Sequence, residues 1–282
     1  MAAGPPAPLD PRAALDAIGQ LPDAEIDVAD AALQLARLDG QSARWQDARE
    51  ELSALAREAA SIAARVEAPD LEARAEALTG LLVTRHGYRG DTETYDDLAN
   101  ANLIKVIERR KGIPVALGIL WLHAARAAGW GAHGVNFPMH FLISLEGKGT
   151  QLVVDVFNGG ETMDARHLRG LLKKIEGERA ELRPGLLQPM SLRDVLLRLQ
   201  NNIKARRLDA GDLAGALTVA EDMLRIAPGH APLWREAGLM HQRLDHVGAA
   251  LRCYDRFLAL VPQGDAAERA RAAIQELRQR LH

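Results

Sequence analysis

The feature that most constrains this fold is a repeat in the C-terminal third of the chain. Three pairs of identical residues recur 34 residues apart, namely Ala216 and Ala250, Leu217 and Leu251, and Pro228 and Pro262. That period is typical of a unit of two antiparallel helices, which buries its apolar face only when it stacks on a neighbouring unit. The sequence therefore predicts stacked helix pairs from about residue 191 onward.

The second copy of the repeat carries the fuller signature of a tetratricopeptide unit. Its signature residues are Trp234, Gly238, Ala250, Tyr254 and Pro262. The first copy has Lys204 where the glycine is expected, and residues 265–282 are predicted to form a capping helix. We therefore predict a domain over 191–282 that consists of two tetratricopeptide repeats and a cap.

The N-terminal part of the chain is predicted to be helical after an irregular start. Residues 1–24 lack the basic and apolar regions of a signal peptide, and we expect a disordered or loosely ordered tail there. Apolar residues then recur at helical spacing over 30–82. This pattern predicts three or four helices, broken near Gly40 and at 68–70.

A buried helix and a small sheet are predicted in the middle of the chain. After a polar, turn-rich loop over 85–100, an apolar helix is expected to begin at Pro114, because proline is favoured at the first helical position. The periodicity changes to two across 132–157, which predicts antiparallel strands. Helices packed on such a sheet make an α+β fold, and we predict this domain to span 25–184.

Composition and charge argue against two classes of partner. The chain has 282 residues and a formal net charge of −3, which gives no reason to expect nucleic acid as a partner. The longest apolar run, 113–122, is about half of the roughly 20 residues that span a bilayer, so no membrane segment is expected. The single cysteine, Cys253, excludes an internal disulfide and fits a reducing compartment, and we predict a cytoplasmic location.

The sequence offers no pattern for a metal ion or a cofactor. The histidines at 86, 123, 133 and 140 never occur at the HxxxH or HxH spacing of a local metal site. The glycines at 129 and 131 lack the third glycine and the following helix of a dinucleotide-binding fingerprint. We therefore predict neither a metal nor a cofactor.

Three features that could carry chemistry follow one another along the chain. Gly112 precedes the helix that begins at Pro114, His140 begins a strand, and Asp155 lies late in the next strand. This order resembles the transglutaminase-like branch of the papain-type cysteine enzymes. In those enzymes a cysteine at the helix tip, a histidine and an aspartate form the catalytic triad, in which the carboxylate orients the imidazole that activates the thiol.

The match is closer still to the SirB-type proteins, in which a transglutaminase-like domain precedes tetratricopeptide repeats. Three blocks carry the resemblance: ERRKGIP at 108–114, GVNFPMHFL at 134–142 and DVFNGG at 155–160. Their motif residues are Glu108, Arg109, Gly112, Pro114, Phe137, Pro138, Asn158, Gly159 and Gly160. The resemblance covers nearly everything after about residue 25, and it implies a transglutaminase-like core followed by the repeat domain.

The resemblance also identifies what this chain lacks. His140 and Asp155 match the histidine and aspartate of the triad, whereas Pro114 falls where the enzymes have cysteine. No serine, threonine or cysteine occurs from residue 102 to 123, so a shift of one or two positions does not restore a nucleophile. Cys253 lies far away in the second repeat, where we expect a small packing residue.

Two functional hypotheses remain open from the sequence. The first is a non-catalytic, regulatory protein whose repeats bind a protein partner, with Arg206, Arg207, Arg235 and Arg243 as candidates for the binding surface. The second is a hydrolase or transferase in which the His140–Asp155 pair activates water or a substrate hydroxyl, assisted by Glu108 or Glu161.

Structural interpretations stand beside both hypotheses. His140 can be a hydrogen-bonded structural residue, and Asp155 can be a turn former that accepts from nearby backbone N–H groups. Asn158, Gly159 and Gly160 are expected to form a tight turn, and Phe137-Pro138 a rigid strand entrance. The repeats, in turn, can serve as a buttress for the core.

Overall fold

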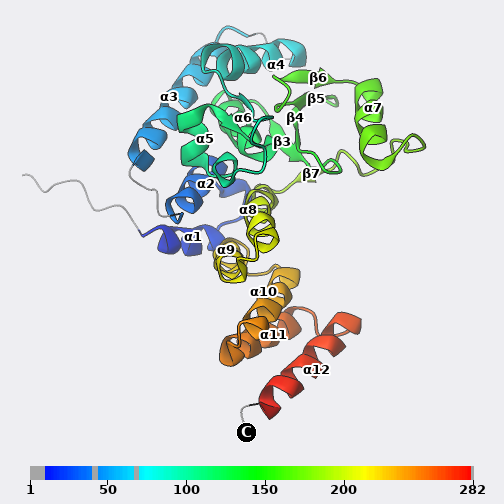
Figure 1. The fold of residues 1–282 in the computed structure, drawn as a ribbon. Coiled ribbons are helices and arrows are strands. Elements are labelled where there is room, and N and C mark those ends of the chain that lie inside the picture. The colour runs from blue at the N-terminus through cyan, green and yellow to red at the C-terminus, as the bar shows by residue number, and fades with distance from the viewer. Residues whose placement is uncertain (1–9, 40–43, 67–69, 281–282) are drawn as a thin grey trace, which may run out of the picture. The chain divides into compact units, whose positions relative to one another are not determined.

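The computed structural model describes residues 10–39, 44–66 and 70–280 (Figure 1). The chain divides into two units, Pro22–Leu199 and Met1–Leu21 together with Gln200–His282. We call them the core unit and the repeat unit. Within the described part of the chain, every helix is too short or too polar to cross a membrane.

Helices make up the first half of the core unit, and carboxylates cap two of them. They are η1 (Asp23–Glu25), α2 (Val28–Arg37), α3 (Trp45–Ala63), α4 (Leu71–Thr79) and its continuation η3 (Gly80–Arg85). The side chain of Asp27 caps α2, and that of Asp70 caps α4. The predicted helices are confirmed, although Gly40 and residues 68 and 69, where breaks were expected, lie outside the described residues.

The segment 85–100 is not the plain loop that its polar sequence predicts. It contains the short strand β1 (Arg89–Gly90) and the 3-10 turn η4 (Leu98–Asn100), and it is followed by α5 (Leu103–Arg109) and β2 (Lys111–Gly112). β1 pairs in parallel with β2. This pairing, between residues far apart in the sequence, leaves no local pattern and fastens the segment beside the start of the next helix.

The central helix of the core unit is α6 (Pro114–Ala127). It is buried without interruption from Pro114 through Leu122, as expected for a helix that is apolar on every side. Pro114 occupies its first position, and Gly129, at a φ of 70°, follows its last turn. Both ends of this helix are as predicted.

A five-stranded antiparallel sheet lies between α6 and α7 (Ala165–Glu176) (Figure 1). Its order is β6-β5-β4-β3-β7, with β3 (Ala132–Val135), β4 (Leu142–Glu146), β5 (Gln151–Asp155), β6 (Glu161–Met163) and β7 (Pro189–Met190). α6 contacts β3 and β4, whereas Leu168 and Leu172 of α7 pack in a cluster with Phe137 and strand residues. The predicted α+β architecture with a small antiparallel sheet is confirmed.

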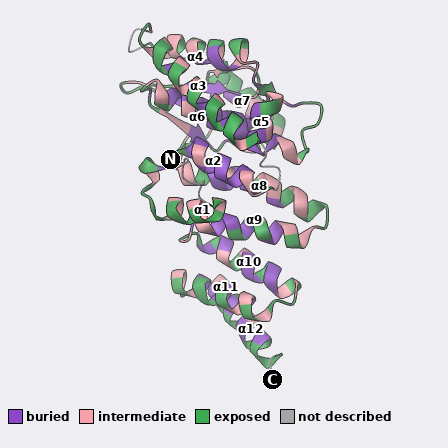
Figure 2. Cartoon of the chain, turned by 90° about the vertical axis from the view of Figure 1, so that its left-hand side faces the viewer, coloured by how far each residue is buried: buried purple, intermediate pink, exposed green. Residues whose placement is uncertain are grey.

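In the described part of the repeat unit, all secondary structure is helical. Its helices are α1 (Pro11–Gln20), the end of α8 (Leu192–Asp209), α9 (Leu213–Ile226), α10 (Ala231–Arg243), α11 (Val247–Leu260) and α12 (Asp265–Gln279). Figure 2 shows buried and exposed residues alternating along α9 to α12, as expected for helices with one apolar face. Two helix pairs and a cap therefore form as the 34-residue period predicts.

The signature residues pack the second repeat. In the first repeat, the large and the small residue of one signature pair exchange positions. A side chain at Gly238 would meet the Tyr254 ring at 3.0 Å, so the missing side chain lets the ring approach α10. One period earlier, the bulky Lys204 stands where the glycine is expected, and the small Ala220 stands where the tyrosine is. Lys204 is only 6% exposed, and its ammonium lies 2.6 Å from Glu236.

The other signature residues have ordinary packing roles. The Trp234 indole donates to the carbonyl of Pro228 at 2.9 Å, and Ala250 is fully buried. The carbonyl of Pro262 accepts a hydrogen bond from Arg271. These contacts join neighbouring turns and helices of the second repeat and its cap.

Two predictions about the ends of the domains need correction. Residues 11–20 are not a loose tail but form α1, which is capped by Asp10 and buries Leu15 completely against the repeat unit. The division between the units falls at residues 199 and 200, rather than between 184 and 191. The first difference arises because α1 is stabilised by contacts with α9, about 200 residues away, which local periodicity cannot indicate. The second arises because the first turns of α8 bond to Asp23 and to the carbonyl of His140 in the core unit.

Candidate functional site

The sheet brings together two of the three residues of the expected triad. His140 lies just before β4, and Asp155 ends the neighbouring strand β5. Nε2 of His140 lies 3.0 Å from Oδ2 of Asp155, and the two side chains are 13% and 3% exposed. Phe141, the next residue after His140, packs on Gly118 of α6 so closely that a side chain there would meet the ring at 2.3 Å.

The carboxylate of Asp155 has two roles at once. Oδ1 accepts from the backbone N–H groups of Phe157 and Asn158, at 3.0 and 3.2 Å, while Oδ2 accepts from the Asn158 amide at 2.8 Å as well as facing His140. The turn-forming interpretation of Asp155 and its predicted partnership with His140 therefore both hold in the structure.

Burial and hydrogen bonding act in opposite directions on Asp155. Burial alone would raise its pKa, but the hydrogen bonds from His140 and Asn158 outweigh burial and lower the pKa below its ordinary value. An ionised carboxylate only accepts hydrogen bonds, so Nε2 of His140 carries the proton. In the neutral imidazole this leaves Nδ1 as an acceptor, the form in which a histidine can serve as a base.

The turn after Asp155 requires both of its glycines to have positive φ. Gly159 and Gly160 have φ of 75° and 81°, as expected from the sequence. Gly160 also lies against α6, where a side chain would meet the Trp121 ring at 2.9 Å. The Asn-Gly-Gly turn thus fixes the end of β5, and with it Asp155, against the central helix.

An arginine that sequence analysis missed holds the histidine loop. Arg198 of α8 donates to the carbonyl of His140 at 2.8 Å and to the side chain of Asn136. Between them, Met139 has a φ of 49° and is 85% exposed, and His140 N–H donates to the carbonyl of Phe137 at 3.0 Å. No local signal marks Arg198, because it lies 58 residues from His140.

Aromatic rings extend the surroundings of the His140–Asp155 pair. Phe157 lies edge-on to His140 at 6.4 Å between ring centroids and edge-on to Tyr95 at 5.9 Å. Gly90 of β1 faces the Phe157 ring, where a side chain would approach to 2.6 Å. The segment 85–100 therefore reaches the pair through Tyr95 and Gly90.

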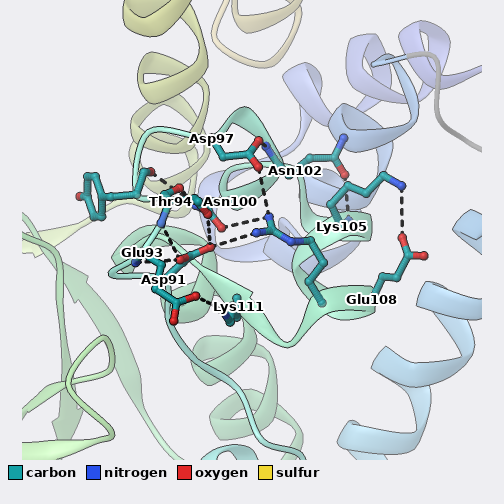
Figure 3. A network of polar contacts seen from close by, with 12 residues as sticks. Asp91, Glu93, Thr94, Asp97, Asn100, Asn102, Lys105, Glu108 and Lys111 are labelled. Carbon is teal, nitrogen blue, oxygen red and sulfur yellow. Dashed lines mark hydrogen bonds and ion pairs between the residues drawn. The ribbon is translucent and has the colours of Figure 1, made fainter.

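The ERRKGIP block holds the segment 85–100 in place. Figure 3 shows the polar contacts that basic residues of the block make with acidic side chains of the segment. Arg109 donates to the buried Asp91 at 2.9 Å and to Asn100 at 3.2 Å. Asp91 also accepts from the backbone and hydroxyl of Thr94. The backbone hydrogen bond from Thr94 is the chief cause that holds the pKa of Asp91 well below its usual range, although burial opposes it.

Other residues of the block complete this attachment. Gly112 packs against Val106 and the carbonyl of Asn100, and the N–H of Ile113, the residue before Pro114, donates to that same carbonyl at 3.1 Å. Asp91 and Asn100, which sequence analysis did not single out, are the buried acceptors on which the motif depends.

The two carboxylates that were proposed to assist the pair, Glu108 and Glu161, lie in different surroundings. Glu108 binds Arg44 at 2.9 Å and Lys105 at 3.2 Å on the outside of α5 (Figure 3 labels Glu108 and Lys105). Glu161 is exposed at the start of β6, opposite Asp155 in the register. Across the described residues, no three histidine, cysteine or acidic side chains gather in a way that could hold a metal ion.

Comparison with known proteins identifies the family. The sequence model of the transglutaminase-like superfamily matches residues 46–201, and a tetratricopeptide-repeat model matches 203–275. The chain belongs to the transglutaminase-like superfamily. This transglutaminase-like chain thus has the two-part organisation that its repeat and its motifs predict.

Bacterial relatives match both parts. A UPF0162 protein of Pseudomonas aeruginosa is 31% identical over 269 residues, which cover 93% of this chain and 94% of that protein. A UPF0162 protein of Xylella fastidiosa is 31% identical over 204 residues, covering 71% and 73% of the two chains. Protein SirB1 of Salmonella typhimurium is 27% identical over 247 residues, covering 86% and 88%. The predicted relationship to SirB-type proteins is confirmed.

The repeat unit of this transglutaminase-like protein has a cavity of about 820 Å³ between α1, α9, α10 and α11. Leu224, Pro228, Trp234 and Cys253 contribute its apolar part. Cys253 is 7% exposed, and burial raises its pKa to about 11, as expected for a packing residue.

Arginines line this cavity, but not the ones that were proposed from the sequence. Arg12, Arg225, Arg252 and Arg256 contribute to it. Of the proposed residues, Arg206 contacts Asn202 and Arg207 pairs with Asp212 at 2.7 Å, while Arg235 and Arg243 are exposed elsewhere. Helical periodicity alone does not indicate which helix faces, among them that of α1, enclose this cavity.

Proposed function

We propose that this protein is a non-catalytic member of its superfamily that acts by binding a protein partner through its repeat unit. The observation that carries the proposal is Pro114, which occupies the tip of α6 in a core unit that otherwise keeps a bonded His140–Asp155 pair. Proline has no side-chain nucleophile, and it lacks the N–H with which a helix tip would stabilise an anion.

The contacts of the three motif blocks support a structural role for them. Asp155 is fully engaged by its turn and by His140, and Arg109 is engaged by Asp91 and Asn100. Each of these groups has hydrogen-bond partners that the fold requires whether or not a reaction takes place. The single buried thiol of Cys253 is compatible with a reducing compartment, which supports the predicted cytoplasmic location.

The repeat unit supports the binding half of the proposal. Tetratricopeptide repeats commonly present helical surfaces to other proteins, and a cavity of about 820 Å³ is within the size range of ligand pockets. Outside the cavity, Leu239 of α10 is an apolar side chain that is 43% exposed. The repeat unit therefore offers a partner the cavity and, outside it, an exposed apolar side chain.

Photo-crosslinking from full-length protein in its own cells tests this proposal. A photoreactive phenylalanine derivative would replace Thr218 in the cavity, Leu239 on α10, or Lys148 on the core unit as the matched exposed control. We expect a discrete protein adduct from at least one repeat-unit position and none from Lys148. Adducts that form only at Lys148, or at no position, would contradict a partner-binding repeat unit and favour its role as a buttress.

A second candidate function rests on one specific observation. The Nε2–Oδ2 contact of 3.0 Å is the geometry in which a carboxylate orients a histidine base. A hydrolase or transferase that activates water or a substrate hydroxyl would need no cysteine. This hypothesis predicts turnover that depends on His140, whereas the non-catalytic proposal predicts none. An activity assay of wild type and a His140 variant therefore distinguishes the two functions.

A further inference from the structure

The repeat unit already contains one docked amphipathic helix. α1 lies on α9 and buries Leu15 completely there. Asp16 of α1 accepts from Arg225 at 2.7 and 2.9 Å, and Arg12 donates to Asp222 at 2.9 Å. Helices α1 and α9 are so close that a side chain on Gly19 would overlap the carbonyl of Arg225 at 2.0 Å. One apolar side chain flanked by ion pairs is thus how this surface holds a helix.

The cavity continues this surface from α9 onto α11. Its apolar part includes Leu224, which is 6% exposed, and Cys253, which is 7% exposed. Arg252 and Arg256 stand one helical turn apart on α11, and both are exposed. Within the described ranges neither of these two arginines has a hydrogen-bond or ion-pair partner. The cavity therefore resembles the α1 site in having an apolar surface beside arginines. It differs because no carboxylate of the described residues pairs with Arg252 or Arg256.

The acidic residues of the cavity do not neutralise these two arginines. Asp16 is bound by Arg225, Asp222 by Arg12, and Glu221 lies 3.2 Å from His241. Charge complementarity thus calls for carboxylates from outside the cavity. A polyphosphate backbone fits less well, because three carboxylates line the same walls and would repel a dense negative charge.

We propose that this cavity binds an acidic amphipathic helix of a partner protein, with carboxylates on Arg252 and Arg256 and an apolar side chain against Leu224 and Cys253. The inference rests on the proposed partner-binding function and names the chemistry of the partner. The helix-in-groove mode requires apolar anchors at spacings of three and four residues, and the acidic residues would lie one turn apart beside them. α1 provides the example within the same unit.

A selection from a displayed library of random 16-residue peptides on the full-length protein tests the inference. We expect the enriched peptides to carry apolar residues at helical spacing and at least two acidic residues one turn apart. The best synthetic peptide should bind the R252E/R256E variant at least about tenfold more weakly, since two ion pairs become two repulsions. The variant R235E/R243E changes two exposed arginines outside the cavity and should bind as wild type does.

A charge swap makes the assignment specific. The counterpart peptide with lysine in place of its acidic residues should bind R252E/R256E better than wild type, and thermal unfolding should show that both variants remain folded. Enriched peptides without acidic residues, or binding that survives R252E/R256E, would overturn the inference. A selection that enriches no peptide would overturn it as well. Adducts from Leu239 in cells would then still support the proposed function, so the two failures are distinguishable.

Discussion

Nε2 of His140 and Oδ2 of Asp155 lie 3.0 Å apart, in side chains that are 13% and 3% exposed. The same carboxylate accepts from two backbone N–H groups of the following turn and from the Asn158 amide. The pair is therefore part of the structure that ends β5. The presence of the pair needs no catalytic explanation, because replacing Asp155 would leave several buried donors unpaired.

Two adjacent glycines allow backbone conformation and packing to be separated. Gly160→Ala should lower the free energy of unfolding by about 2–4 kcal/mol, from left-handed strain and from overlap with Trp121. Gly159→Ala has the same strain but faces open space, and should cost only about 1 kcal/mol. Urea unfolding of the two variants measures the difference. Equal losses would show that α6 tolerates a side chain at Gly160.

The Arg109 network should be a major source of stability in the core unit. Arg109→Ala leaves the buried Asp91 and Asn100 without their shared donor, and should lower the free energy of unfolding by about 2–3 kcal/mol. Arg109→Lys keeps the charge but cannot bond both acceptors in the same way, and should lose about 1 kcal/mol. Arg44→Ala, at an exposed ion pair with Glu108, is the control and should unfold like wild type. If Arg109→Ala lowers the free energy of unfolding no more than Arg44→Ala does, the Arg109 network is not a major source of stability.

Asp91 should also shape the stability of the protein in acid. Its pKa in the folded state lies well below the ordinary value of 3.8, chiefly because of the Thr94 backbone hydrogen bond. A lowered folded-state pKa stabilises the fold at pH values above the ordinary pKa, and this stabilisation is lost as the pH falls below it. The unfolding free energy should therefore drop as the pH is lowered from about 5 to 2. Asp155, whose pKa is also lowered, contributes in the same direction.

Asp91→Asn isolates this contribution. The variant should be less stable than wild type at neutral pH, and the difference should shrink as the pH falls, because asparagine has no proton to take up in this range. Denaturant titrations at a series of pH values measure both curves. Parallel curves would mean that Asp91 keeps an ordinary pKa in the folded protein.

The sequence predicted those parts of the structure that depend on local pattern. Pro114 and Gly129 mark the ends of α6 because each has a backbone preference that acts at its own position. The 34-residue period located the helix pairs. Strand periodicity placed Asp155 on β5 and His140 at the start of the neighbouring strand, whereas His140 lies in the loop just before β4. The features that were not predicted depend on partners far away in the sequence. α1 packs on α9, Arg198 bonds to the loop before β4, and Asp91 accepts from Arg109.

The cavity of the repeat unit shows the same limit. Arg206, Arg207, Arg235 and Arg243 are as basic as the arginines that line it, and composition cannot rank them. Arg252 and Arg256 stand out only once Arg12 and Arg225 are seen to be paired with acidic residues. Charge patterns therefore indicate candidates, whereas pairing in the folded unit decides which of them are available.

The central claim, that the retained pair performs no reaction, is tested most directly by turnover of amide and ester substrate panels. Full-length wild type and His140→Ala would be assayed side by side. His133→Ala is the matched control, since His133 is 12% exposed and lies 2.7 Å from Glu146 on the same sheet. We predict the same background rate for all three proteins. Turnover by wild type and His133→Ala that His140→Ala abolishes while remaining folded would contradict the account and establish an enzyme.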